Sequence, residues 1–301
     1  MKLSIISTKF NRVWENTIEL RSILCQGWHR DDFELIIIDE STTAENAELY
    51  NSVANDINIQ YIHVSDWYKA RSENLFVHKN DRVNHSIHYN WGIKNANANI
   101  ICILNGEVVH IANTLDSFYA TPDRSIKHAT MRNIDRCSIQ HYVRDVNTYP
   151  IDENKVSFTS WFSHPEKPGF HEFNTGSIHK KQLERLRGMD ERYMAGWQCE
   201  TNELLDRLER CDIQLEYDED LLLGHIEHDK PDSNWATIPS DQYRAAQRVR
   251  HMMDAGYYDD DIRRIRYYRP GTEKPPLIAN PDGWGIFPEE ITTRTMKEVI
   301  Q

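Results

Sequence analysis

The chain has 301 residues, enough for one large domain or two smaller ones with a buried core. Its 39% hydrophobic and 27% charged residues are typical of a globular protein, and no run of about 18 apolar residues could cross a membrane. The net charge of −12 argues against a surface built to bind nucleic-acid backbones. The five cysteines are scattered without a C-x-x-C pair, so the sequence signals neither a disulfide framework nor a cysteine zinc site.

The chain opens with a short apolar run at residues 3–6 that meets polar residues at Thr8 and Lys9. A secretory signal peptide needs an apolar core of about 7–15 residues, which this run does not reach. We therefore interpret it as a first β-strand and expect a cytoplasmic protein.

Four runs rich in Ile, Leu and Val predict β-strands at residues 3–6, 35–38, 59–64 and 100–104. These runs lack polar alternation, so we expect both faces of each strand to be covered. Between the first two runs, residues 13–25 predict an amphipathic helix. This order predicts an α/β protein with a mainly parallel central sheet flanked by helices.

The rest of the chain is less regular. Residues 120–175 are rich in turns, and an apolar stripe predicts a helix at about 200–211. The composition shifts after Pro231, where we expect a helix at 240–255 and then a cluster of tyrosines and arginines at 257–269. This cluster is either packed surface or a site that stacks on a sugar, a nucleotide or a nucleic acid. We treat 230–301 as a C-terminal helical and coil extension.

Ligands of parallel sheets bind beyond the carboxyl ends of the strands, which directs attention to residues 8–11, 39–41 and 105–107. The turn after the first strand contains no glycine. The chain also lacks the glycine-rich phosphate loops, the G-x-S-x-G elbow and the H-E-x-x-H motif. P-loop nucleotide-binding, Rossmann dinucleotide-binding, hydrolase and zincin functions are therefore disfavoured.

Five segments resemble, in order, the motifs of GT-A glycosyltransferases, most nearly family 2. They are S-I-I-S-T-K-F-N-R at 4–12, I-I-I-D-E-S-T at 36–42, H-Y-N-W-G-I-K-N-A at 88–96, I-L-N-G-E at 103–107, and 173–201, which contains G-M-D-E-R-Y and W-Q-C-E-T. Where the family has D-x-D, this chain has Asn105-x-Glu107. The resemblance implies a GT-A domain at 1–229, with a nucleotide-sugar half at about 1–110 and an acceptor half at about 111–229.

The resemblance also implies roles for single residues. The nucleotide would contact Thr8, Asn11, Arg12, Asp39 and Asn90. A divalent metal and the diphosphate would be held by Asn105, Glu107 and His225, and the sugar or acceptor side would include Gly176, Asp190 and Trp197. The general base would be Glu200, with Glu203 in reserve.

Several of these residues also have a plain structural interpretation. Asp39 could cap the helix that follows it, and Glu200 could be an ordinary first-turn acid of its helix. His225 and His228, three residues apart, could be an ordinary surface pair.

We expect a metal-dependent, inverting hexosyltransferase that uses Mn²⁺ or Mg²⁺ and a nucleotide-diphosphate sugar, with a UDP-sugar favoured. The acceptor is a hydroxyl of a glycan, a lipid carrier, a protein or a nucleobase. A nucleic-acid acceptor is disfavoured, because residues 1–229 carry all of the net negative charge, although 230–301 are neutral overall. The alternatives are a nucleotidyltransferase on a related fold and a degenerate, non-catalytic sugar- or nucleotide-binding module.

Overall fold

The computed structural model describes residues 1–65, 85–144, 151–164, 175–191, 200–228, 277–280, 283–287 and 292–301. All four predicted strands are present; the first three are longer than their apolar runs, and the fourth has the predicted bounds. They are β1 (Leu3–Lys9), β2 (Phe33–Asp39), β3 (Asn58–Ser65) and β4 (Ile100–Leu104). They pair in parallel in the order β3-β2-β1-β4, which confirms the predicted parallel centre of the sheet.

Further strands extend this centre into one ten-stranded sheet in the order β10-β3-β2-β1-β4-β8-β6-β9-β5, with β7 paired to β6. They are β5 (Val108–His110), β6 (Ser125–Ile134), β7 (Phe158–Ser163), β8 (Gly176–His179), β9 (Gln214–Ile226) and β10 (Thr292–Thr295). β8 pairs antiparallel with both β4 and β6, whereas β9 runs parallel to β6.

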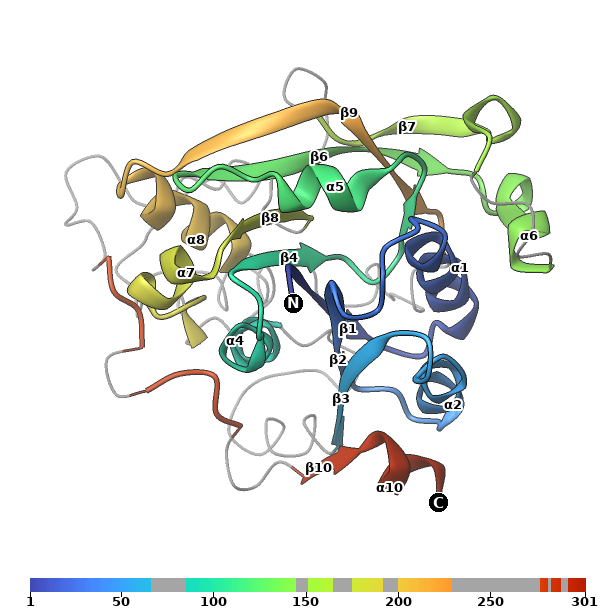
Figure 1. The fold of residues 1–301 in the computed structure, drawn as a ribbon, viewed down its shortest axis with the longest axis horizontal. Coiled ribbons are helices and arrows are strands. Elements are labelled where there is room, and N and C mark those ends of the chain that lie inside the picture. The colour runs from blue at the N-terminus through green and yellow to red at the C-terminus, as the bar shows by residue number, and fades with distance from the viewer. Residues whose placement is uncertain are drawn as a thin grey trace, which may run out of the picture.

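Helices cover both faces of the parallel strands. Figure 1 shows α1 (Val13–Leu24) and α2 (Glu45–Ser52) on one side, and α4 (Ser86–Asn95), α7 (Lys180–Leu186) and α8 (Glu200–Glu209) on the other. The remaining described helices are α5 (Thr114–Tyr119), α6 (Arg136–Arg144), α10 (Met296–Ile300) and a short 3₁₀ turn at Glu153–Lys155. The predicted helices at 13–25 and 200–211 are therefore confirmed.

Each face of the sheet has its own hydrophobic core. Alternate residues of β2 divide between them, because Ile36 and Ile38 face the core beneath α4 and α7 while Leu35 and Ile37 face the core beneath α1 and α2. A strand buried on both faces needs apolar side chains in both directions, which explains the absence of polar alternation in these runs.

Three described parts of 230–301, at residues 277–280, 283–287 and 292–301, pack on the same domain. Ala279 N donates a hydrogen bond to Leu186 O at 3.1 Å, and Trp284 and Phe287 pack on the core beneath α4. β10 adds an antiparallel strand beside β3. The predicted helix at 240–255 and the tyrosine and arginine cluster at 257–269 lie outside the described residues.

In the part of the chain that the structure describes, no helix combines the length and the apolar character needed to cross a membrane.

Candidate functional site

The turns after β1 and β2 are joined at the carboxyl edge of the sheet. Asn11 N donates to Ser41 Oγ at 2.9 Å, and Thr42 N donates to Asn11 Oδ1 at 2.8 Å. Asn11 has φ of 47°, a left-handed conformation that asparagine adopts more readily than most residues. The two turns that the sequence indicated for nucleotide binding therefore form one connected edge.

Glu107 lies in the next turn of this edge, after β4. The preceding Gly106 approaches the backbone closely, because a Cβ there would lie 2.8 Å from Thr8 O. The Glu107 carboxylate forms an ion pair with Arg12, and its Oε1 lies 3.9 Å from His228 Nε2. The structure thus brings together three segments that are far apart in the sequence.

The pairing of β9 with β5 places His225 and His228 close to Glu107. It runs antiparallel to β5 with His225 opposite Val108, and Ile226 N donates to Glu107 O at 2.9 Å. The ring of His225 stacks on Phe162 with centroids 4.0 Å apart and an interplanar angle of 16°. His225 Nδ1 lies 2.9 Å from Asn133 Oδ1, which can only accept a hydrogen bond. Nδ1 therefore donates, and a neutral ring presents Nε2 as its basic nitrogen.

This cluster fits a divalent metal ion. Glu107, His225 and His228 each offer one ligand atom, and these atoms all lie within 4.8 Å of one another. One carboxylate and two imidazoles suit Mn²⁺ or another transition ion better than Mg²⁺, which prefers oxygen ligands and water. The predicted metal residues Glu107 and His225 lie in this cluster. Asn105 lies in the same turn, where its Oδ1 accepts from Gly106 N at 3.1 Å.

Asp39 is fully buried at the end of β2. Its Oδ1 accepts from Ser41 N at 2.9 Å, and its Oδ2 accepts from the Tyr61 hydroxyl at 2.5 Å. Burial and the negative charge of Asp39 raise the pKa of Tyr61. The N-cap of α2 is Ala44, so Asp39 does not cap that helix and instead shapes the turn that contacts Asn11. Thr8, one residue before the end of β1, is also buried, and its contact with nucleotide stays a prediction.

Asn90 is buried in α4 and holds the turn after α7. Its amide nitrogen donates to Met189 O at 2.8 Å and to Glu191 Oε1 at 2.9 Å, while its oxygen accepts from Met189 N at 2.7 Å. Burial raises the pKa of Glu191. The hydrogen bonds of Asn90 described here all serve this turn, and its predicted nucleotide contact remains a prediction.

The structure describes four of the five residues predicted for catalysis and for the sugar or acceptor side. Glu203 is buried in an ion pair with Arg207, whose guanidinium also donates to Leu186 O at 3.0 Å and to Gly188 O at 2.8 Å. This pair ties α8 to the end of α7, so Glu203 has a structural contact. Glu200 is the first residue of α8, Gly176 begins β8, and Asp190 is buried in the turn after α7. Trp197 lies outside the described residues.

Sequence reasoning missed the residues that orient the candidate ligands. Phe162 belongs to a stretch that carried no clear pattern, and Asn133 stands in a strand without a motif. Both reach His225 through strand pairing across the sheet, which no local spacing reveals. His228 could be found, because it shares the segment G-H-I-E-H-D with His225.

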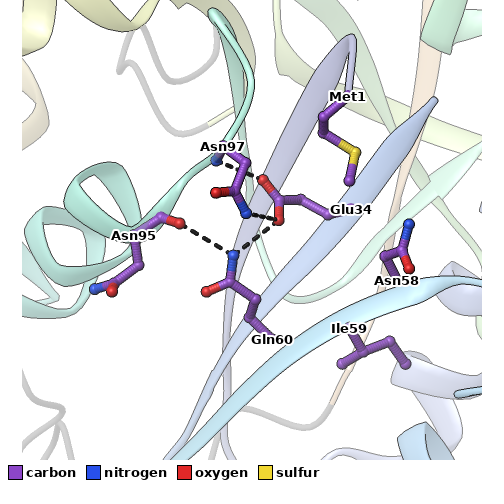
Figure 2. Close-up of a pocket in the computed structure, with 7 residues that line it drawn as sticks. All are labelled: Met1, Glu34, Asn58, Ile59, Gln60, Asn95 and Asn97. Carbon is purple, nitrogen blue, oxygen red and sulfur yellow. Dashed lines mark hydrogen bonds between the residues drawn. The ribbon is translucent and has the colours of Figure 1, made fainter. Parts of the chain in front are cut away.

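A polar pocket opens at the opposite edge of the sheet. Figure 2 shows its lining residues, which are Met1, Glu34, Asn58, Ile59, Gln60, Asn95 and Asn97. Glu34 Oε1 accepts from Asn97 N at 2.7 Å, and Oε2 accepts from Gln60 Nε2 at 2.8 Å. Burial acts to raise the pKa of Glu34, but hydrogen bonds to its carboxylate outweigh it and lower the pKa. Glu34 thus links the amino ends of the strands, away from Glu107.

No protein-family model matches this chain, and no curated protein matches it. Among solved structures, the chain is similar to S. aureus TarS 1-349 in complex with UDP-GlcNAc, with a TM-score of 0.51 and 13% identity, covering 87% of this chain and 68% of that one.

Two further solved structures are similar. A mannosyltransferase from Pyrobaculum calidifontis, in complex with GDP-Man and Mn²⁺, has a TM-score of 0.48 and 15% identity over 84% of this chain and 64% of its own. S. aureus TarS has a TM-score of 0.48 and 14% identity over 75% of this chain and 37% of its own. The chain therefore spans less than two thirds of the length of these two proteins. Together with the mixed sheet and its flanking helices, the likeness to TarS 1-349 shows that the chain has a GT-A-like glycosyltransferase fold.

Proposed function

We propose that the protein is an inverting glycosyltransferase that moves a hexose from a nucleotide-diphosphate donor, with UDP-sugars favoured, to a hydroxyl acceptor. The observation that carries this proposal is the meeting of Arg12, Glu107, His225 and His228 at the carboxyl edge of the sheet. This edge is where α/β sheets bind their ligands.

The donor would lie across the joined turns. Asn11 and Asp39 belong to the connected turns after β1 and β2, and Thr8 and Asn90 complete the predicted nucleotide contacts. Arg12 brings a guanidinium to the same edge, and this group matches the geometry of phosphate oxygens. Arg12 would then exchange part of its ion pair with Glu107 for contact with the diphosphate.

Glu107, His225 and His228 would hold a divalent cation, with Asn105 beside them in the turn. A bound divalent cation neutralises the charge that develops on the departing diphosphate. The hydrogen bond to Asn133 and the stack on Phe162 hold His225 in one tautomer and one orientation. Because the ligand group contains two imidazoles, Mn²⁺ is favoured over Mg²⁺.

The acceptor hydroxyl must lose a proton as it attacks the sugar. Glu200, at the start of α8, would accept this proton as general base, because the carboxylate of Glu203 is engaged by Arg207. Gly176, Asp190 and Trp197 would line the sugar and acceptor side. A single direct displacement of the diphosphate inverts the configuration of the sugar.

Substitution of Glu107 tests the proposal. Glu107→Gln keeps the size of the side chain and removes its charge, so we expect loss of about 100-fold or more in Mn²⁺-dependent turnover of a UDP-sugar. The readout is donor hydrolysis and transfer, measured over a panel of UDP-, GDP-, CDP-, dTDP- and ADP-sugars.

Glu227→Gln is the matched control, because Glu227 is an exposed carboxylate between His225 and His228 and lies outside the ligand group. This variant should keep wild-type turnover. Equal turnover by both variants would reject the assignment of Glu107. A wild-type protein that binds a nucleotide diphosphate but turns over none of these donors would instead be a binding module.

A further inference from the structure

A second group of ligand-type side chains lies beside the end of β2. Glu40 follows β2 directly, His85 is the N-cap of α4, and His88 lies in the first turn of that helix. Glu40 Oε1 lies 3.2 Å from His88 Nε2 and 3.5 Å from His85 Nδ1. One ligand atom from each residue lies within 4.8 Å of the other two.

These separations match the dimensions of a transition-metal site. Ligand atoms that are each about 2.0–2.2 Å from a tetrahedral Zn²⁺ ion lie about 3.4 Å from one another. The two distances from Glu40 Oε1 lie on either side of this value. Two imidazoles and one carboxylate are also a common ligand set of zinc sites that keep a fourth position open.

The surrounding fold holds the three residues in place. The side chains of His88 and Glu40 are buried, the ring of His88 lies 5.5 Å from that of Phe287, and Glu40 N donates to Lys9 O at 2.9 Å. The side chain of His85 is 33% exposed, so solvent reaches the group at this residue. A cation could therefore enter past His85 and keep a water ligand there.

We propose that Glu40, His85 and His88 form a binding site for a Zn²⁺-type transition-metal ion, separate from the Glu107 cluster. The two groups share no residue. A cation here would link the first turn of α4 to the residue after Asp39, and so brace the edge on which the candidate donor site is built. The proposed role of this cation is structural. The proposal does not depend on whether the protein transfers a sugar.

Binding of Co²⁺ to the full-length Glu107→Gln variant tests this site. Co²⁺ takes the ligands of Zn²⁺ and reports its coordination through visible d–d absorption. The Glu107→Gln background weakens the first cluster, so we expect about one tightly bound Co²⁺ per chain, displaced by Zn²⁺. The number of bound ions is measured by equilibrium dialysis with metal analysis.

His85→Gln is the informative second substitution, because His85 is partly exposed and its loss leaves the buried side chains in place. Added to Glu107→Gln, it should weaken Co²⁺ binding by more than the roughly 10- to 100-fold that loss of an outer-shell partner costs. Zn²⁺ should also raise the unfolding temperature of the Glu107→Gln protein, and adding His85→Gln should abolish this increase. His29→Gln, at an exposed histidine outside both groups, should change neither quantity.

Either of two results would overturn the site. One is a Glu107→Gln protein that binds no Co²⁺, and the other is unchanged Co²⁺ affinity after His85→Gln is added. Failure here leaves the proposed glycosyl transfer intact, because that proposal is judged by donor turnover of the Glu107→Gln and Glu227→Gln variants.

Discussion

At the scale of single residues, His110 shows how burial sets the charge of a side chain. It lies in β5, where its ring contacts Thr114 Oγ1 and its backbone nitrogen donates to Ser22 Oγ at 3.1 Å. Burial lowers the pKa of His110 from 6.5 to about 3, with a smaller effect from the positive charge of Lys9. The imidazole is therefore neutral in the folded protein at every pH at which the protein is expected to work.

This pKa shift predicts part of the acid sensitivity of the fold. Below pH 6.5 the unfolded chain binds a proton at His110 that the folded chain does not bind until about pH 3. His110 should therefore reduce the free energy of unfolding by about 1.4 kcal/mol for each pH unit across this window. Above pH 6.5 it should contribute no pH dependence.

The measurement is urea unfolding of wild type and His110→Gln between pH 7 and pH 4. Glutamine lacks the titrating group, so the difference in unfolding free energy between the two proteins should change with pH by about the slope given above. Parallel curves for His110→Gln and wild type would show that His110 is not held neutral.

At the scale of elements, the position of His225 depends on how closely β9 crosses its neighbours. Gly224 pairs with Val109 of β5 and with Arg132 of β6. A Cβ at Gly224 would overlap the Cδ1 atom of Ile134 and would lie 2.8 Å from Val109 Cγ1. The glycine therefore lets three strands meet at the residue before a candidate metal ligand.

Gly224→Ala should destabilise the protein by about 1–3 kcal/mol, because added volume in a packed core forces its neighbours to move. Ile134→Val removes the Cδ1 atom that meets the new methyl group and should cost about 0.5–1.5 kcal/mol alone. The double variant should be more stable than the sum of the two single effects predicts. Chemical denaturation of all four proteins gives the coupling energy, and additive effects would contradict this packing.

The strands themselves were easier to predict from the sequence than the way they pair. Four strands were predicted correctly from the apolar runs at 3–6, 35–38, 59–64 and 100–104. A strand that is buried on both faces needs apolar residues at successive positions, so it can be recognised in the sequence. No local sequence pattern predicted that β9 pairs with both β5 and β6, or that β10 pairs with β3. Such pairings join segments far apart in the sequence and are decided by packing of the whole sheet.

In the candidate sites, too, some residues could be predicted from the sequence, whereas others come together only in the folded chain. Glu107 and His225 were predicted as metal ligands because the resemblance to GT-A glycosyltransferases implies that role at these two positions. Asn133 and Phe162, which orient His225, were not predicted, because they reach it only through strand pairing. Glu40 and His85 were not predicted as a pair either, since the contact between the end of β2 and the start of α4 exists only in the folded chain.

At the scale of the whole molecule, the candidate donor site joins three distant segments. Arg12 follows β1, Glu107 follows β4, His225 is the second-to-last residue of β9, and His228 lies two residues beyond the end of that strand. The proposed donor would meet the cation of this site through its diphosphate, and the ion pair of Arg12 with Glu107 stands between them. Each ligand would therefore find its site better organised when the other is already bound.

This arrangement predicts positive coupling between Mn²⁺ and a nucleoside diphosphate. We expect the favoured diphosphate, UDP in the present proposal, to bind about 5- to 150-fold more tightly with saturating Mn²⁺, which corresponds to about 1–3 kcal/mol. Because coupling of equilibrium affinities is reciprocal, saturating UDP should tighten Mn²⁺ binding by the same factor. Calorimetric titrations in both orders measure the two factors, after correction for the complex that Mn²⁺ and UDP form in free solution.

Glu107→Gln separates this coupling from binding in general. If Glu107 links the two ligands, the variant should keep measurable UDP binding through the turns after β1 and β2 while the coupling factor falls toward one. Glu227→Gln should keep the wild-type factor, since its side chain lies outside the ligand group. Equal UDP affinity with and without Mn²⁺ in the wild type would mean that the diphosphate is held by Arg12 and other side chains alone. The cluster of Glu107, His225 and His228 would then have a role other than donor binding.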